Sequence, residues 1–332
     1  GHDVTVIRRS CYVGDDNHIS SYKGVALKDI YAPRKKSLEA IVHTFLAVLS
    51  ARRMHADILH IHAIGPALLV PYAKMLGLKV VFTHHGPDYD RDKWGIMAKM
   101  VLKWGERMGC LFADEVIVIS EVIRNLIRRK YGRTEQVHLI YNGVPCPDYT
   151  NCPEYFRELG ITERNYILGM CRFVPEKNLH HLVEAFRRVD KKGCRLVLAG
   201  DTDFEDEYSR ALKREARENG VILTGFVKGK KLHSLLTNAR CYVLPSSHEG
   251  LPIALLEAMS YRLPVIVSDI PANKEMGLDA SCYFETGNIE QLADRLQEII
   301  DGDFKQVHYD MEKYGWDGIA LRVADVYENL KK

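Results

Sequence analysis

Short apolar runs alternate with longer amphipathic segments along nearly the whole of this 332-residue chain. The runs are rich in Val, Ile and Leu, which predicts buried strands, and the segments between them have helical spacing. Strands and helices that alternate in this way form parallel sheets with crossover helices. The turn residues Asn-Gly-Val-Pro-Cys-Pro at 142–147 interrupt the alternation and predict a hinge between two α/β domains.

The predicted strands of the first half lie at 4–8, 57–62, 79–83, 115–120 and 137–141. Those of the second half lie at 166–171, 195–199, 221–224, 241–244, 264–268 and 281–284. Helices are predicted near 37–53, 66–76, 93–112, 121–130, 178–190, 206–218, 229–238, 252–261 and 288–301. Residues 304–331 are predicted to be helical to the end.

Composition excludes several classes of protein. The chain is 46% hydrophobic, which suits two domains with real cores, and its net charge is +2. Residues 1–150 carry a net charge of +6 and the remainder −4. That suits an anionic partner or membrane surface but is too weak to indicate nucleic acid. Eight cysteines without a Cys-x-x-Cys pair predict the reduced thiols of a cytoplasmic protein.

The stretch at 245–257 reads Pro-Ser-Ser-His-Glu-Gly-Leu-Pro-Ile-Ala-Leu-Leu-Glu and joins a predicted strand to a predicted helix. Free amides and the helix dipole at Gly250 and Leu251 attract an anion. Glu249 and Glu257 would repel a phosphate, so their natural partners are sugar hydroxyls. The stretch therefore predicts a nucleotide-sugar site. The alternative is that both glutamates are merely solvated.

The spacing of Glu249 and Glu257 resembles the Glu-x7-Glu signature of retaining glycosyltransferases of the GT-B architecture, family 4. The resemblance covers nearly the whole chain. It implies an α/β fold of two facing Rossmann-like domains with parallel sheets and a cleft between them. Residues 1–145 would form the acceptor-side domain, residues 146–309 the nucleotide-sugar domain, and residues 310–332 a helix that crosses back to the first domain.

The same resemblance implies roles for the residues of the stretch. Glu249 would orient the donor sugar, and Glu257 would hold the ribose. The remaining donor-site residues would be those at the start of the helix: Gly250, Leu251, Pro252 and Ile253. A proline fits there because its missing N–H would have no partner in the first turn.

Two cations follow the predicted strand 166–171. Arg172 can grip a phosphate with two hydrogen bonds, and Lys177 offers a compact charge. The pair resembles the Arg-x4-Lys element of the same family, which implies that both residues hold the donor diphosphate. The alternative is a solvated surface loop.

Another strand end carries candidate contacts to the nucleotide base. The sequence Thr-Gly-Phe-Val at 224–227 places a glycine where the backbone can approach a ligand closely. In the resembled family the Gly-x-Val segment lies against the base, so Phe226 and Val227 are candidates. An ordinary turn is the alternative.

In the first half, residues 82–94 follow a predicted strand and contain His-His-Gly-Pro-Asp. They resemble a family 4 branch of bacterial capsule and cell-wall polysaccharide enzymes, rhamnosyl- or hexosyltransferases. The match implies that His85 faces the donor sugar and that Asp88 lies near the acceptor. Ser120, at the end of the next predicted strand, is a weaker candidate for a donor contact.

Two Asp-x-Asp triplets, Asp88-Tyr-Asp90 and Asp201-Thr-Asp203, could hold a divalent ion against a diphosphate. Arg172, Lys177 and a helix start already supply that positive charge. The sequence therefore predicts no metal and no cofactor other than the donor substrate.

These elements predict a retaining, metal-independent glycosyltransferase. It would move a sugar from a nucleotide-diphosphate donor to a saccharide or lipid-linked acceptor in cell-envelope polysaccharide synthesis. Two alternatives stay open: a GT-B protein that binds a nucleotide-sugar without turnover, and a sugar-nucleotide epimerase of the GT-B type. We expect the protein to be cytoplasmic, with peripheral contact to an anionic membrane as a hypothesis, and to bind no nucleic acid.

The predicted helix at 93–112 has an apolar arc wider than one core-facing stripe requires. The sequence favours burial between the sheet and a neighbouring element. It leaves open that the outer edge of the arc, with basic loops, rests on anionic lipid.

The chain opens with Gly-His-Asp-Val-Thr-Val-Ile, which in the resembled family is the second strand. We therefore expect a preceding strand and glycine-rich loop to be missing. A gap or an exposed edge should lie beside residues 4–8, because a central strand pairs on both sides. Transfer by such a fragment should be weak or absent, whereas nucleotide binding by the second domain should persist.

Overall fold

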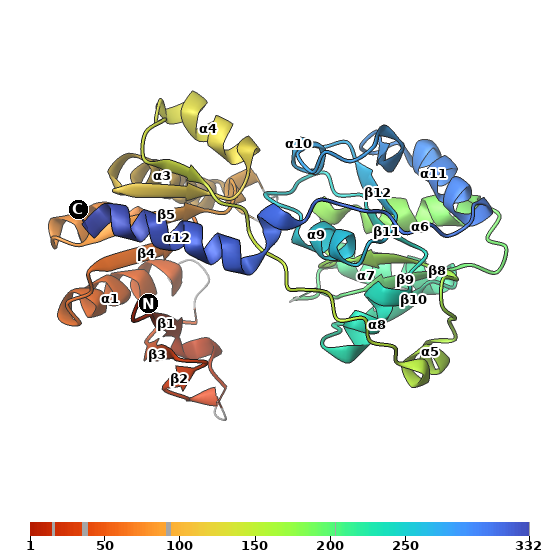
Figure 1. Ribbon diagram of the computed structural model, residues 1–332, viewed down its shortest axis with the longest axis horizontal. Helices are drawn as coiled ribbons and strands as arrows, with labels where there is room; N and C mark the ends of the chain where they lie inside the picture. Colours follow the sequence, from red (N-terminus) through yellow and green to blue (C-terminus); the bar gives the residue numbers. More distant parts are fainter. Residues whose placement is uncertain (15–16, 35–38, 91–93, 203, 332) are drawn as a thin grey trace. The chain divides into compact units, whose positions relative to one another are not determined.

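The computed structural model describes residues 1–14, 17–34, 39–90, 94–202 and 204–331. The chain forms two compact units (Figure 1). The first unit comprises Gly1–Ile140 together with Arg322–Lys332, and the second comprises Tyr141–Leu321. Each unit is an α/β assembly with parallel strands, as the alternating sequence predicts.

The first unit contains two sheets. One has the order β1-β3-β2, from β1 (Thr5–Arg9), β3 (Val25–Ile30) and β2 (Ser21–Tyr22). The other is parallel throughout, in the order β4 (Ile58–His62), β5 (Lys79–His84), β6 (Glu115–Val118) and β7 (Val137–Leu139). Its helices are α1 (Glu39–Arg53), α2 (Val70–Met75), α3 (Ile96–Phe112) and α4 (Glu121–Tyr131). The helix α12 (Trp316–Lys331) begins in the second unit and ends in the first.

The strand β1 has an open edge. It pairs in parallel with β3, and no other described strand pairs with it. Val4 and Val6 at this edge are 47% and 44% exposed although both are apolar. The edge expected beside residues 4–8 is therefore present.

The second unit has one parallel sheet of six strands. Its order is β10 (Ile222–Gly225), β9 (Arg195–Ala199), β8 (Tyr166–Met170), β11 (Cys241–Leu244), β12 (Val265–Ser268) and β13 (Tyr283–Phe284). The helices are α5 (Pro153–Leu159), α6 (Leu179–Arg188), α7 (Glu207–Glu218), α8 (Lys230–Asn238), α9 (Ile253–Ser260), α10 (Pro271–Lys274) and α11 (Ile289–Asp301). All six strands are parallel, and their order runs outward in both directions from β8 and β11, so the strand order switches between these two strands.

The core of the second unit packs its sheet closely against a helix. Strand residues such as Ile167, Leu198 and Val243 pack against Leu182 and Phe186 of α6, and all of them are buried. Each fully buried side chain of this size contributes roughly 1.5–3 kcal/mol. The loops at the strand ends are therefore held on a well-packed base.

The helix α3 corrects the favoured prediction of burial. Ile96, Met97 and Trp104 are 81%, 71% and 60% exposed. The buried residues of α3 are instead Gly105, Glu106, Gly109 and Cys110. The helix packs through its small residues because these allow close approach, and its large apolar side chains face outward.

Three further segments differ from the prediction. Residues 304–315 form an irregular strap with one short turn of 3₁₀ helix, and α12 begins only at Trp316. The strap is fixed by the Val307 amide, which donates to the Arg262 carbonyl, and by the Tyr309 hydroxyl, which donates to the Leu263 carbonyl. The hairpin β2–β3 and the helix α5 were not predicted.

All eight cysteines are free, as predicted.

Candidate functional site

In the second unit, the predicted diphosphate residues lie at the ends of β8 and β11, the two neighbouring strands between which the strand order switches. Residues 171–177 follow β8, and residues 245–252 follow β11, which is the neighbouring strand. In open parallel sheets, ligands bind beyond the carboxyl ends of the strands at such a switch. The fold therefore brings the two motifs to one place.

Direct contacts join these two loops. The Lys177 ammonium lies 2.5 Å from Oε1 of Glu249, and their side chains are only 16% and 9% exposed. The Ser247 amide donates to the Glu176 carbonyl, and the Asn178 side chain donates to the Pro245 carbonyl. These two hydrogen bonds hold the loops together, so the charges of Lys177 and Glu249 are fixed beside each other.

Arg172 lies in the same loop as Lys177, directly after β8. Its neighbour Phe173 is 1% exposed and its amide donates to the Asp201 carbonyl, which anchors the loop in the core. A guanidinium and an ammonium thus lie on one anchored loop, and both are groups that bind phosphate.

The start of α9 reduces the number of backbone amides that are available to bind an anion. The helix begins at Ile253, one residue later than predicted, and the Ile253 amide already donates to the Leu251 carbonyl. Pro252 has no amide hydrogen. An anion cradle at this end therefore depends on the amides of Gly250 and Leu251 rather than on those of Pro252 and Ile253.

Glu257 lies one turn inside α9. Burial raises the pKa of its carboxyl group, and the nearby His233 acts weakly in the opposite direction. A carboxylate that has lost part of its hydration gains from a new hydroxyl donor. That property suits the predicted contact with a ribose.

The loops after β9 and β10 meet the loop after β8. The backbone of Gly200 approaches so closely that an added Cβ would lie 2.0 Å from the Cys171 carbonyl oxygen. The Gly200 amide donates to the Gly225 carbonyl. Phe226 follows at once and is 59% exposed, and Val227 is half-buried. An exposed aromatic ring on such a braced loop is available to stack on a base.

In the first unit, His85 follows β5 and has a partner that the sequence analysis missed. Its Nε2 lies 3.1 Å from Nδ1 of His62 at the end of β4, the adjacent strand. His60 stacks on His62, with ring centroids 4.2 Å apart. Its two ring nitrogens lie 2.6 Å from the hydroxyls of Tyr327 and Thr83. The pattern His60-x-His62 at a strand end was the available signal.

Burial keeps this histidine cluster neutral. It lowers the pKa of His85 to about 4, with smaller contributions from His62 and His84. It lowers the pKa of His60 to about 3. Near neutral pH, His85 is therefore a neutral hydrogen-bonding group rather than a fixed cation.

Asp88 and Ser120 have different surroundings. Asp88 is half-buried in a short 3₁₀ turn that follows His85. Ser120 is 1% exposed, and its hydroxyl oxygen accepts from the Ile123 amide as the N-cap of α4. Capping accounts for this serine without a ligand, so its donor contact stays a prediction.

The surroundings of the Asp-x-Asp triplets do not resemble a metal site. Asp201 forms an ion pair with Lys213 at 2.7 Å, and Asp203 lies outside the described residues. Tyr89, between Asp88 and Asp90, is buried. Within the described part of the chain, no group of three or more His, Cys, Asp or Glu residues could hold a metal ion.

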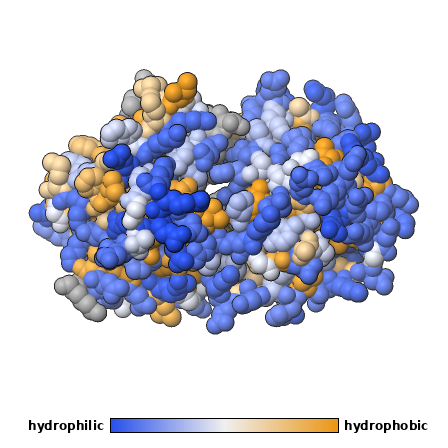
Figure 2. Space-filling model, turned by 90° about the horizontal axis from the view of Figure 1, so that it is seen from above, coloured by the Kyte–Doolittle hydropathy of each residue, from blue (hydrophilic) through white to orange (hydrophobic). Residues whose placement is uncertain are grey.

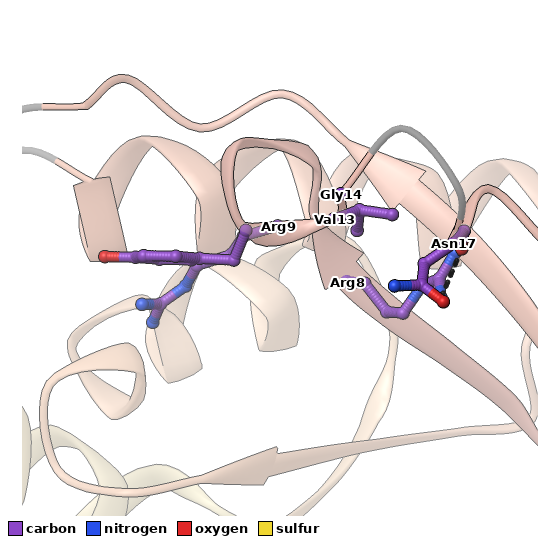
Figure 3. A pocket seen from close by; sticks show the side chains of 6 residues that line it. Arg8, Arg9, Val13, Gly14 and Asn17 are labelled. Atoms are coloured by element: carbon purple, nitrogen blue, oxygen red, sulfur yellow. Dashed lines mark hydrogen bonds between the residues drawn. The ribbon is translucent and has the colours of Figure 1, made fainter.

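A separate hollow of about 360 Å³ lies at the end of β1 (Figure 3). Figure 3 shows Arg8 beside Asn17, with Arg9 directed elsewhere. Arg8 is paired with Asp29 at 2.7 Å, and Arg9 with Glu39 at 2.6 Å. Both guanidinium groups therefore have carboxylate partners inside the first unit.

Among the described residues, no helix combines the length and the apolar composition needed to cross a bilayer.

Comparisons with known proteins identify the family of the chain. Residues 1–146 match the family model described as Glycosyltransferase Family 4, and residues 152–316 match the one described as Glycosyl transferases group 1. The alpha-D-kanosaminyltransferase of Streptomyces kanamyceticus is 25% identical over 265 residues, which are 75% of this chain and 68% of that protein. The O-antigen chain mannosyltransferase B of Escherichia coli is 24% identical over 234 residues, which are 66% of this chain and 61% of that protein.

Among solved structures, Anabaena HepE in complex with UDP and glucose is similar, with a TM-score of 0.77 at 18% identity. The match covers 92% of this chain and 87% of that one. At this identity the likeness shows the fold, and the two family models show the family. The chain belongs to the family 4 glycosyltransferases and has their GT-B fold of two Rossmann-like units.

Proposed function

We propose that this glycosyltransferase is a retaining, metal-independent enzyme that takes a hexosyl or rhamnosyl group from a nucleotide-diphosphate-sugar. The acceptor is a saccharide or lipid-linked saccharide of a cell-envelope polysaccharide. The observation that carries the proposal is the contact of Lys177 with Glu249. It lies in the same loop region as Arg172, at the ends of the neighbouring strands β8 and β11. The HepE complexes with UDP and with UDP-glucose, and the O-antigen mannosyltransferase, support the donor and acceptor classes.

In this mechanism the positive charge serves the leaving group. The bond between the anomeric carbon and the phosphate oxygen breaks, and negative charge grows on the diphosphate. Arg172, Lys177 and the amides of Gly250 and Leu251 stabilise that charge more strongly in the transition state than in the bound donor. No metal is needed for this role. EDTA should therefore leave transfer unchanged, and loss of activity restored by Mn²⁺ would contradict this part of the proposal.

Glu249 orients the donor sugar by accepting hydrogen bonds from its hydroxyl groups. Its ion pair with Lys177 makes it a poor covalent nucleophile, unlike the second carboxylate of a retaining glycosidase. The acceptor hydroxyl attacks from the face that the diphosphate leaves. Its oxygen forms the new glycosidic bond, and its proton passes to the departing phosphate. Neutral His85 donates or accepts a hydrogen bond at the sugar, and Asp88 contacts the acceptor.

We further propose that the exposed face of α3 contacts the cytoplasmic membrane at its inner surface. Trp104 and Met97 lie in its apolar arc, and Lys103 and Arg107 on the same helix are exposed. Figure 2 shows hydrophobic side chains exposed between hydrophilic areas on the part of the surface that the first unit forms. Aromatic and basic side chains together suit an interface with anionic lipid. This surface would hold the enzyme near a lipid-linked acceptor.

The membrane contact is tested by co-sedimentation with vesicles of neutral or partly anionic lipid. Binding should rise with the anionic fraction and fall in Trp104→Glu. Tyr31→Glu is the matched control because Tyr31 is an exposed aromatic residue outside α3. Binding that ignores both the anionic fraction and Trp104→Glu would overturn the membrane contact.

The donor class is tested first by thermal shift with a panel of nucleotide-sugars, because a ligand of the native state raises its melting temperature. Product analysis with the best donor then separates the alternatives. A transferred sugar supports the proposal. An isomerised donor would indicate an epimerase, and binding without any product would indicate a binding protein.

A further inference from the structure

A fully buried carboxylate lies behind the candidate residues of the first unit. Glu106 of α3 is 0% exposed. Its Oε1 accepts from Nε2 of His84 at 3.1 Å and from the Tyr89 hydroxyl at 2.9 Å. Its Oε2 accepts from the Tyr131 hydroxyl at 2.5 Å and from the Lys130 ammonium. Two donors for each oxygen satisfy the carboxylate, which a buried charge requires.

These contacts keep Glu106 ionised. Burial would raise the pKa of its carboxyl group, but the hydrogen bonds from His84, Lys130 and Tyr131 lower it to about 2. The carboxylate is thus a permanent acceptor at physiological pH.

The contacts also set the tautomer of His84. The Gly86 amide donates to Nδ1 of His84 at 3.0 Å, so this nitrogen carries no proton. The proton is on Nε2, which donates it to Glu106. One carboxylate thereby fixes the ring that holds the Gly86 amide, with Gly86 at the positive φ of 128°.

Glu106 holds the turn from both of its ends. His84 stands directly before His85, and Tyr89 stands directly after Asp88. Two backbone bonds brace this segment: the Asp88 amide donates to the Gly86 carbonyl, and the Asp90 amide, just beyond Tyr89, donates to the Pro87 carbonyl. His85 and Asp88 thus lie on a segment whose two neighbouring residues, His84 and Tyr89, both bond the same buried carboxylate.

We infer that Glu106 is a positioning residue for transfer: it aims His85 and Asp88 by clamping the turn between His84 and Tyr89. The inference rests on the proposed function for the roles of His85 and Asp88. It goes beyond that proposal because Glu106 contacts no substrate and acts through His84 and Tyr89.

The isosteric variant Glu106→Gln tests whether Glu106 fixes the His84 ring. Its amide has one oxygen, so its NH₂ group must face one pair of donors. The Lys130 ammonium has no lone pair, so the oxygen must face Lys130 and the NH₂ faces His84. The ring must then move its proton to Nδ1 to accept from the NH₂ group. Nδ1 can then no longer accept from Gly86. The variant therefore loses either the bond to residue 106 or the bond to Gly86.

The test uses hydrogen exchange on the full chain, which requires no substrate. In Glu106→Gln, exchange of the Gly86 amide should rise about fivefold to tenfold, the effect of losing one hydrogen bond. The matched control is Glu115→Gln. Glu115 is also a buried glutamate bonded to a histidine, His138, at 2.6 Å, but it lies outside the turn. The control should leave Gly86 unchanged.

Tyr89→Phe is the milder second variant, in case Glu106→Gln does not fold. It removes the far attachment of the turn to Glu106 and, with the same hydroxyl, the acceptor of a hydrogen bond from Lys130. Exchange should rise at the amides of Asp88 and Asp90 and stay unchanged at Gly86. Equal exchange of these amides in wild type and Tyr89→Phe, or equal effects of Glu106→Gln and Glu115→Gln, would overturn the clamp.

The second readout separates positioning from general stability. With the donor found by thermal shift, Glu106→Gln should lower kcat by about tenfold or more, as expected when reacting groups are misplaced. Its Kd for UDP should stay within about twofold, because UDP contacts are proposed for the second unit. A loss of kcat no greater than in Glu115→Gln would contradict a positioning role. If no donor is turned over by the wild type, the proposed function fails, whereas the exchange result still decides the clamp.

Discussion

At the residue scale, the ion pair of Lys177 and Glu249 is the feature on which the donor site depends. Lys177→Ala should lower kcat by about 10²–10³, the loss measured when one group that stabilises a leaving oxyanion is removed. Arg172→Ala should act similarly. Lys192→Ala is the control, because Lys192 forms an exposed ion pair with Asp301 and precedes β9, outside the two loops of the donor site. Steady-state rates within threefold of wild type in both site variants would refute the diphosphate assignment.

The neutral histidines of the first unit predict an effect of pH on stability. Burial lowers the pKa of His60 to about 3 in the folded protein. A histidine of the unfolded chain has a pKa of ~6.5, so the unfolded chain binds the proton at a higher pH than the folded protein does. Stability should therefore fall as pH falls from about 6.5 toward 3. Between pH 7 and pH 5 the free energy of unfolding of the first unit should drop by about 1–2 kcal/mol.

Urea titrations at the two pH values measure this drop. It should be smaller in His60→Asn than in wild type. The exposed His55 provides the control substitution, His55→Asn, which should retain the full effect. An unchanged pH dependence in His60→Asn would show that His60 is not its source.

At the element scale, α3 shows why close packing depends on glycine. A Cβ at Gly105 would lie 2.0 Å from the Ile64 carbonyl oxygen, and one at Gly109 would lie 2.7 Å from the Phe82 ring. Gly105→Ala must displace backbone and should destabilise the first unit by roughly 1–3 kcal/mol or more. Gly318→Ala in α12 meets no atom within 4 Å and should instead stabilise by roughly 0.5–1 kcal/mol. Denaturant midpoints of the two variants that shift in the same direction would contradict this account.

Elements were predicted better than their contacts. The strands 195–199 and 241–244 have the predicted bounds, because continuous apolar runs between polar segments mark buried parallel strands well. The hairpin β2–β3 was missed because its turn uses positive φ at Lys23 and Gly24, and a lysine is a poor signal for that conformation. The burial prediction for α3 failed because a helical pattern gives an apolar arc but not the direction in which it faces.

The same limit applies to the candidate site. Each of Lys177, Glu249 and His85 could be placed at a strand end from local pattern alone. That Lys177 touches Glu249 depends on β8 pairing with β11, a contact between segments 72 residues apart. Glu106 gave no sequence signal, since a glutamate on a helix is ordinarily exposed.

At the scale of the whole molecule, α12 contributes to both units. Its last residues pack with the first unit: the Arg322 guanidinium donates to the Leu139 carbonyl, the Tyr327 hydroxyl bonds His60, and Val326 is buried. Gly143 of the second unit packs against Trp316 at the other end of the helix. Residues 322–332 therefore complete the core of the first unit from the far end of the chain.

Removing residues 322–332 should weaken the first unit alone. It removes the buried side chain of Val326 and the Tyr327 hydroxyl that bonds His60, and it leaves buried polar groups without partners, each at a cost of about 1–3 kcal/mol. Hydrogen exchange should accelerate in β4 to β7 and stay unchanged in β8 to β12, and the thermal shift with UDP should persist because its proposed contacts lie in the second unit. Leu321→Ala is the control, since Leu321 is exposed and precedes the deleted segment. Faster exchange throughout both units would show instead that they unfold as one cooperative body.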